Sequence, residues 1–481
     1  MNKKCQVFTS GEYANYLLDK ADYKSNLYQK TVLENSCGDG KILVEIVKRY
    51  IEDCINQKIP LNQIKTGLER DIYGFEIDAK YWKKCIENLN DIAMEYNIKD
   101  ISWKIFNEDF LKATVNIRFD FVIGNPPYIN YRDLDIDIRD FLRTNFDSCK
   151  EGKFDYCYAF IESGLNFLNE DGKLAYIIPN SIFKNVFGKR LRNYMLEYIK
   201  DIYNFSNEKL FEKILTYSAI AIFKKSNDIN KIRYHDVNQE IDIYINKKDL
   251  GDKWIFKSKK QINKCEYVRF GDFFHAAISV ATLLNDAFVI KEYQEFKEYY
   301  RVNGIDIEKN LISLAASPKN IKNGNQEIII YPYYYKNGDV ISYSENEFYK
   351  KFPNGVLYLS EFKEKLEKRK SSEGIKWFEY GRTQALKNMC KKKILISTVI
   401  TKKVNTKILD EGVIPYSGIY IIQKGNVSIE KAKLILESDN FLEYVQEIGT
   451  SISGNSIRIT PKDINNYMFQ KGGFLNGKDE I

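Results

Sequence analysis

The chain has 481 residues, 44% of them hydrophobic, and a formal net charge of +7 at pH 7. This length favours two or three domains with sizeable cores. No run of about eighteen apolar residues occurs, which excludes an ordinary membrane-spanning helix. No two of the eight cysteines have CxxC spacing, so neither a zinc site nor a disulfide framework is indicated, and we expect no metal site. The N-terminal residues 1–5 lack an apolar signal region, and we expect a cytoplasmic protein.

The first candidate strand, residues 31–33, leads into a glycine-bearing loop and a helix. The loop, residues 34–40, reads ENSCGDG, and apolar residues recur at helical spacing from 42 to 47. Strand, glycine loop and helix open a doubly wound fold, in which glycines let the backbone approach a ligand. The loop lacks both GxGxxG and the Ser or Thr of a phosphate-binding loop. It therefore favours a small, partly cationic ligand over a pyrophosphate.

Acidic residues follow the next two candidate strands. Glu76 comes directly after residues 72–75, where this fold usually holds a ribose diol. Asp109 and Phe110 follow a short strand around residues 105–106, and a carboxylate beside an aromatic can bind an adenine amino group and cover its ring. Taken singly, each acid is more often a helix cap than a ligand-binding group.

A buried strand, residues 119–124, runs into the tetrapeptide Asn125-Pro126-Pro127-Tyr128. Asn125 offers a side-chain oxygen as acceptor, Pro126 a free carbonyl, and Tyr128 a ring for stacking. Such a ledge can hold a planar amino group while it is attacked from its face. The alternative is a surface turn, because Asn-Pro often starts turns. The order of the four motifs favours an S-adenosylmethionine site whose reacting methyl group is directed at an amino nitrogen.

With these motifs the chain resembles the gamma class of DNA adenine-N6 methyltransferases with a C-terminal specificity domain of the TaqI type. The resemblance implies a Rossmann-like S-adenosylmethionine-dependent methyltransferase domain with a mostly parallel sheet over residues 1–240. It implies a mixed α+β target-recognition domain over residues 241–481. The expected reaction moves a methyl group to N6 of an adenine flipped out of double-stranded DNA. Flipping costs a few kcal/mol, roughly, and stacking returns about 1–3 kcal/mol per contact.

The resemblance also implies which residues form the site. Asn125, Pro126 and Tyr128 would be catalytic, and Phe211 would face Tyr128 across the extruded adenine; plain core packing is the alternative for Phe211. Glu34 stands where the family usually has Asp, which lengthens the carboxylate arm. The residues expected around the cofactor are Phe8, Thr9, Glu34, Cys37, Gly38, Gly40, Glu76, Asp109, Phe110 and Asn125.

The second half of the chain holds the excess of positive charge. Residues 331–410 contain 17 Lys and Arg against 9 Asp and Glu, a difference of +8. Basic residues among aromatics are typical of a phosphate-contacting surface, although a solvated helix face has a similar composition. Trp377, Arg382 and Gln384 are candidate DNA-binding residues; Arg382 and Gln384 could equally be buried structural groups. The interleaved aromatics are Tyr331, Tyr333, Tyr334, Tyr335, Trp377, Phe378 and Tyr380.

Several functional alternatives remain at this stage. Asn-Pro-Pro-Tyr also occurs in enzymes that methylate RNA or a glutamine amide, but those families generally lack a large C-terminal half. A non-catalytic DNA-specificity subunit is a third possibility, against which the intact residues 125–128 argue. The first cofactor motif would start within the first ten residues, which leaves no room for a preceding nuclease domain. We expect a monomeric modification enzyme in a bacterial-type cell, either alone or with a separate cognate restriction endonuclease.

Overall fold

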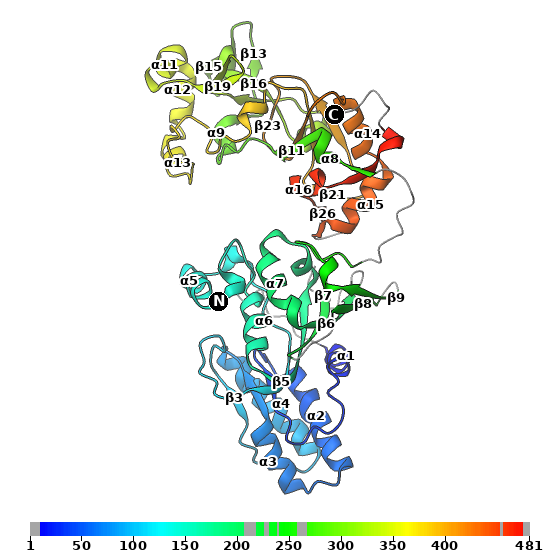
Figure 1. Ribbon diagram of the computed structural model, residues 1–481. Helices are drawn as coiled ribbons and strands as arrows, with labels where there is room; N and C mark the ends of the chain where they lie inside the picture. Colours follow the sequence, from blue (N-terminus) through cyan, green and yellow to red (C-terminus); the bar gives the residue numbers. More distant parts are fainter. Residues whose placement is uncertain are drawn as a thin grey trace. The chain divides into compact units, whose positions relative to one another are not determined.

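The structure is a computed structural model that describes residues 10–205, 218–225, 230–237, 240–256, 267–452 and 456–474 (Figure 1). The chain divides into two compact units. The first comprises Met1–Lys260 with Thr450–Gly454, and the second comprises Gln261–Gly449 with Asn455–Ile481. The boundary expected after residue 240 falls between two paired strands of the first unit, so that unit extends about one hairpin further along the chain than expected.

A nine-stranded sheet forms the centre of the first unit, in the order β3-β2-β1-β4-β5-β7-β6-β8-β9. Neighbours from β3 to β5 are parallel, β7 runs antiparallel to both β5 and β6, and β9 is antiparallel to β8. This confirms the Rossmann-like, mostly parallel fold. The strands are β1 (Val32–Glu34), β2 (Ile72–Phe75), β3 (Lys104–Phe106), β4 (Phe119–Gly124), β5 (Leu168–Pro179), β6 (Ile199–Phe205), β7 (Ser218–Lys224), β8 (Lys231–Asp236) and β9 (Ile241–Asn246).

Helices cover both faces of this sheet, because its strands bury both of their faces. In β5, Ala175 and Ile177 pack into the cluster that contains α1 to α4, whereas Leu174, Tyr176 and Ile178 pack into the cluster that contains α6 and α7. Such two-sided burial is typical of parallel sheets. The helices are α1 (Gly11–Ala21), α2 (Lys41–Asn56), α3 (Leu61–Asp71), α4 (Ala79–Glu95), α5 (Ile136–Asn145), α6 (Cys157–Asn166) and α7 (Lys189–Tyr198).

One local expectation about β5 is wrong. The sequence Asp171-Gly172-Lys173 predicts a turn, and apolar spacing predicts a helix that reaches Leu168, but the helix ends at Asn166 and the strand begins at Leu168. On the parallel neighbour β4, Phe119 pairs with Leu168 and Phe121 pairs with Lys173, so the register shifts between the two pairs. The residues that suggest a turn are accommodated as an irregularity within the strand.

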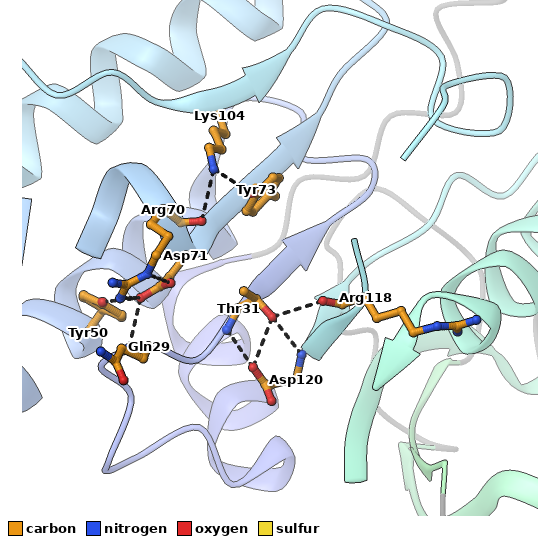
Figure 2. A network of polar contacts seen from close by, with 9 residues as sticks. All are labelled: Gln29, Thr31, Tyr50, Arg70, Asp71, Tyr73, Lys104, Arg118 and Asp120. Atoms are coloured by element: carbon orange, nitrogen blue, oxygen red, sulfur yellow. Dashed lines mark hydrogen bonds and ion pairs between the residues drawn. The ribbon is translucent and has the colours of Figure 1, made fainter. Parts of the chain in front are cut away.

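Three carboxylates hold the segment that enters β1, and Figure 2 shows two of them, Asp71 and Asp120. Asp71 accepts the Gln29 N–H at 3.0 Å and the Tyr50 hydroxyl at 2.6 Å. Asp120 accepts the Thr31 N–H at 2.9 Å. Asp53, on α2, accepts the backbone N–H groups of residues 26 and 27. Because a buried N–H without a partner is costly, these side chains fix the path by which the chain reaches the first strand of the site.

The second unit is a mixed α+β structure, as expected. Its larger sheets have the orders β11-β24-β20-β22, β12-β17-β16-β23 and β13-β14-β15. Their strands are β11 (Phe274–Ile278), β12 (Val289–Ile290), β13 (Gln294–Glu295), β14 (Tyr299–Val302), β15 (Ile305–Glu308), β16 (Ile312–Ala316), β17 (Glu327–Ile330), β20 (Lys393–Ile396), β22 (Thr406–Leu409), β23 (Ile414–Pro415) and β24 (Ile419–Gln423). Further paired strands are β10 (Tyr267–Arg269), β18 (Tyr333–Lys336), β19 (Asp339–Ser342), β21 (Val399–Ile400), β26 (Ile457–Arg458) and β27 (Met468–Gln470).

The helices of the second unit are short. They are α8 (Phe270–Phe273), α9 (Asn285–Phe288), α10 (Pro318–Asn323), α11 (Glu345–Lys351), α12 (Pro353–Ser360), α13 (Lys363–Glu367), α14 (Ile429–Leu436), α15 (Asp439–Ile448), α16 (Pro461–Asn465) and α17 (Lys471–Phe474). In the described part of the chain, none of the helices has the length and apolar character that crossing a membrane requires.

Candidate active site

The glycine loop joins β1 to α2 and turns on two glycines. Gly38 and Gly40 have φ angles of 55° and 82°, a region that glycine adopts without steric cost. A Cβ atom on Gly40 would lie 2.6 Å from the sulfur of Cys85 on α4, so the loop lies too close to that helix for a larger residue. The Cys37 N–H donates to the carbonyl of Phe75 at 2.9 Å. The loop is therefore fixed against the end of β2.

Glu76 fastens the same loop through its side chain. Its Oε2 accepts the Gly38 N–H at 2.9 Å, and its Oε1 accepts the Asp78 N–H at 2.8 Å. Burial raises the pKa of this carboxyl. A carboxylate oxygen can accept more than one hydrogen bond, so both oxygens can still receive ligand hydroxyls. The sequence suggested the ligand role of Glu76 but not its role in holding the loop.

Glu34 ends β1 and is an unusual buried acid. It is 2% exposed, and its Oε2 has no hydrogen-bond partner among the residues that the structure describes. Burial raises its pKa well above the usual range. A Cβ atom on Gly124, the last residue of β4, would lie 3.5 Å from the Glu34 Cγ. An unpaired buried carboxyl is costly, and a cationic or amino-bearing ligand would remove that cost. This side chain therefore fits the charged methionine end of S-adenosylmethionine.

The tetrapeptide at the end of β4 adjoins this loop. The Ser36 hydroxyl donates to the backbone carbonyl of Asn125 at 3.4 Å. Tyr128 lies within hydrogen-bonding distance of two acceptors: Asn125 Oδ1 at 2.6 Å and the Ile177 carbonyl on β5 at 2.7 Å. Burial raises the pKa of Tyr128 well above its usual value, so the hydroxyl stays protonated and donates. This bond orients the Asn125 amide, a function that stacking arguments from the sequence did not suggest.

Asp155 connects the tetrapeptide to α6. The Tyr156 N–H donates to the Ile129 carbonyl at 2.9 Å, directly after the tetrapeptide. Asp155 Oδ1 accepts the Cys157 N–H at 3.1 Å at the start of the helix. Burial raises the pKa of Asp155 to about 6. The sequence signal was an acid just before a helix, but nothing in the sequence placed it beside residue 129.

Asp109 and Phe110 lie at the same end of the sheet. The Leu111 N–H donates to Asp109 Oδ1 at 3.1 Å, which is the capping role that competes with adenine binding. The Phe110 ring is buried and packs on Phe75, with ring centroids 5.1 Å apart. Phe106, at the end of β3, is more exposed and lies 5.0 Å from Phe75. Both aromatics therefore flank the end of β2, and the adenine contact stays a prediction.

The three DNA-binding candidates of the second unit differ in their surroundings. Trp377 is half-buried, and its indole N–H lies 3.2 Å from Glu345 Oε1. Arg382 is half-buried and donates to the Gly381 carbonyl at 3.0 Å. Gln384 is exposed. Phe8, Thr9 and Phe211 lie outside the described residues, and their roles stay predictions.

The expectation that the interleaved aromatics form a phosphate-contacting surface is wrong for most of them. Tyr331, Tyr333, Phe378 and Tyr380 are buried and belong to the core of the second unit. The Tyr380 hydroxyl donates to the Ile330 carbonyl at 2.7 Å. Composition could not separate a basic surface from an aromatic core beneath it, because lysines and tyrosines occur in the same segments.

The sheet order and the glycine loop define a Rossmann-like fold of the kind that S-adenosylmethionine-dependent methyltransferases adopt. Residues 24–211 match the family described as Eco57I restriction-modification methylase.

Two curated relatives and one solved structure extend the likeness. The chain is 24% identical to the type II methyltransferase M.BstVI of Geobacillus stearothermophilus, over 94% of this chain and 87% of that protein. It is 24% identical to the type II restriction enzyme and methyltransferase RM.Eco57I of Escherichia coli, over 86% of this chain but 51% of that protein. The fold is similar to the type IIL restriction-modification enzyme MmeI in complex with DNA, with a TM-score of 0.57 and 14% identity, covering 95% of this chain and 64% of that one.

Proposed function

We propose that the protein is a site-specific DNA methyltransferase that uses S-adenosylmethionine to methylate N6 of an adenine flipped out of double-stranded DNA. The observation that carries this proposal is the pair of acceptors at the end of β4, Asn125 and Pro126, beside the Glu34 carboxyl, whose Oε2 has no hydrogen-bond partner among the described residues. The names of M.BstVI and RM.Eco57I, both type II methyltransferases, support DNA as the substrate.

The acceptors act by fixing the amino group. An adenine amino nitrogen is a poor nucleophile because its lone pair is conjugated into the ring. Asn125 Oδ1 receives the Tyr128 hydroxyl on one lone pair and can accept an amino hydrogen on the other. The Pro126 carbonyl would accept the second hydrogen, which directs the nitrogen lone pair away from the base plane. S-adenosylmethionine, when bound, supplies the electrophilic methyl group. Placement and fixed dipoles then provide the rate enhancement, and the displaced amino proton passes to solvent.

The remaining roles follow from the two units. Glu34, the loop Cys37–Gly40, Glu76 and Asp109 would hold the cofactor, and residues 241–481 would recognise the DNA site. Trp377, Arg382 and Gln384 are the candidates in that half, with Gln384 the most exposed. We also propose that the protein is a monomer and that a separate restriction endonuclease accompanies it. The net charge of +7 supports a polyanionic partner.

The test is long-read sequencing that detects methylated bases, on DNA from a methylation-free host expressing the chain. We expect N6-methyladenine at one defined motif. Asn125→Ala should reduce methylation by at least about 100-fold, as for the loss of a transition-state hydrogen-bond partner. Asn130→Ala is the matched control, because Asn130 is exposed and close by in the chain.

Two outcomes would contradict the proposal. Absence of modified adenine, in a folded protein that binds S-adenosylmethionine, would instead favour RNA or a protein amide as the substrate. Absence of cofactor binding in a folded protein would instead favour a non-catalytic DNA-specificity subunit.

A further inference from the structure

A chain of three polar side chains lies at the end of the sheet where the tetrapeptide is found; Asn204 and Asp236 are buried, and Asn180 is half-buried. Asn180 follows the last residue of β5, Asn204 lies on β6, and Asp236 ends β8. Asn180 comes three residues after Ile177, whose carbonyl receives the Tyr128 hydroxyl. β4, β5, β6 and β8 point the same way in the sheet, so their carboxyl ends meet at one edge, which is where α/β sheets bind ligands.

The hydrogen bonds of this chain have a fixed direction. Asn204 Nδ2 donates to Asp236 Oδ2 at 3.0 Å and to the Tyr234 hydroxyl at 2.8 Å. An ionised carboxylate can only accept, so Asp236 determines which end of the Asn204 amide faces it. Asn204 Oδ1 must then face Asn180, and it accepts Asn180 Nδ2 at 2.5 Å. Asp236 therefore also sets the orientation of the Asn180 amide, two side chains away.

The consequence is a carbonyl oxygen presented without a partner. Asn180 Oδ1 is buried, and within the described part of the chain it has no hydrogen-bond partner. A buried acceptor left unsatisfied is costly, and a ligand N–H would remove that cost. The ligand group must be a donor. A phosphate oxygen would be repelled, since it offers no hydrogen and would face a carbonyl whose network ends in a carboxylate.

We propose that Asn180 Oδ1 accepts a hydrogen bond from an amino or imino hydrogen of a nucleobase that neighbours the flipped adenine, and that Asn180 is a specificity-determining residue. This inference rests on the proposed function. Asn204 and Asp236 are positioning residues that act through Asn180. Asn180 discriminates bases by their edges and does not contact the DNA backbone.

The experiment uses the full-length protein and duplexes that carry its methylation site. At each base of the site in turn, the natural base is replaced by an analogue that lacks one hydrogen-bonding N–H, such as inosine for guanine. The ratio of kcat/KM on natural and analogue DNA is measured for the wild type and for Asn180→Ala. We expect one position where the wild type prefers the natural base by about tenfold, as for one hydrogen bond, and where Asn180→Ala shows no preference.

Two further variants test the positioning chain. Asp236→Asn removes the group that can only accept, and should weaken discrimination at the same position. Tyr234→Phe keeps the Asp236 carboxylate and should preserve the discrimination. A merely structural role would lower kcat/KM equally on all duplexes; that result, or unchanged ratios in Asn180→Ala, overturns the inference alone. A wild-type protein that methylates no DNA overturns the proposed function, and this inference with it.

Discussion

At the residue scale, the hydroxyl of Tyr128 determines how the Asn125 amide is presented. Its bond to Asn125 Oδ1 is 2.6 Å long and competes with the Ile177 carbonyl at 2.7 Å. Tyr128→Phe keeps the ring for stacking but removes this restraint. We expect kcat to fall by up to about tenfold, because one hydrogen bond contributes about 0.5–1.5 kcal/mol. Single-turnover kinetics with saturating cofactor measures this decrease in rate.

The matched control for this change is Tyr131→Phe. The Tyr131 hydroxyl accepts from Arg143 at 3.0 Å rather than bonding to the Asn125 side chain, so its loss should leave the chemical step nearly unchanged. If the two variants had the same kcat, the restraint on Asn125 would have no part in catalysis.

At the scale of elements, the junction between the tetrapeptide and α6 should make stability depend on pH. Burial raises the pKa of Asp155 to about 6, against about 3.9 in an unfolded chain. Between these values the folded state binds more protons, so the contribution of this group to stability falls as pH rises from 4 to 6. The loss amounts to up to about 3 kcal/mol. Asp155→Asn keeps the cap on α6 and removes this dependence.

Urea unfolding at several pH values between 4 and 7 tests this prediction. The difference between wild type and Asp155→Asn isolates the one carboxyl from all others that titrate in the same range. Parallel curves would show that Asp155 ionises normally in the folded protein.

The carboxylates that hold the segment entering β1 should also contribute to stability (Figure 2). Asp71 is buried and binds Arg70 through two hydrogen bonds of 2.7 Å, in addition to Gln29 and Tyr50. Asp71→Ala would leave these donors without their acceptor, and we expect a loss of about 3–5 kcal/mol in unfolding free energy. Asp19→Ala removes a partly exposed ion pair with Arg49 and should cost less than about 1 kcal/mol. Equal losses in urea unfolding would contradict the prediction.

These elements also show what the sequence could and could not predict. Strands 72–75 and 119–124 were predicted to the residue, because continuous apolar runs ended by polar loops are typical of buried parallel strands. The turn at residues 171–173 was wrong, since local turn chemistry was outweighed by pairing with β4.

The same distinction between predictable and unpredictable features applies to the candidate site. Motif order predicted the loop, the acids and the tetrapeptide as parts of the site, because their residue types are visible in one stretch of chain. The Tyr128 bond to Asn125, the Asp155 junction and the chain from Asn180 to Asp236 depend on partners from different strands. Only the register of the sheet brings such residues together, and the sequence does not state the register.

At the scale of the whole molecule, the two units carry separate cores, and each should respond to its own perturbation. In the second unit, Lys393 is 0% exposed. Its ammonium group donates to three backbone carbonyls, those of Met389 at 3.0 Å, Asp410 at 3.4 Å and Val413 at 3.1 Å. Burial lowers the pKa of Lys393 to about 8. No carboxylate within the described residues forms an ion pair with this ammonium group.

Scanning calorimetry can separate the units through this lysine. Between pH 8 and about 10.4 the unfolded state binds a proton that the folded state does not, so stability of the second unit should rise with pH by up to about 3 kcal/mol. Lys393→Met should abolish that rise in one transition and leave the other unchanged. S-adenosylmethionine should raise the Tm of the other transition only, since a ligand stabilises the unit that binds it. A single transition that responds to both perturbations would mean that the units unfold together, and that their cores are coupled despite being separate in the fold.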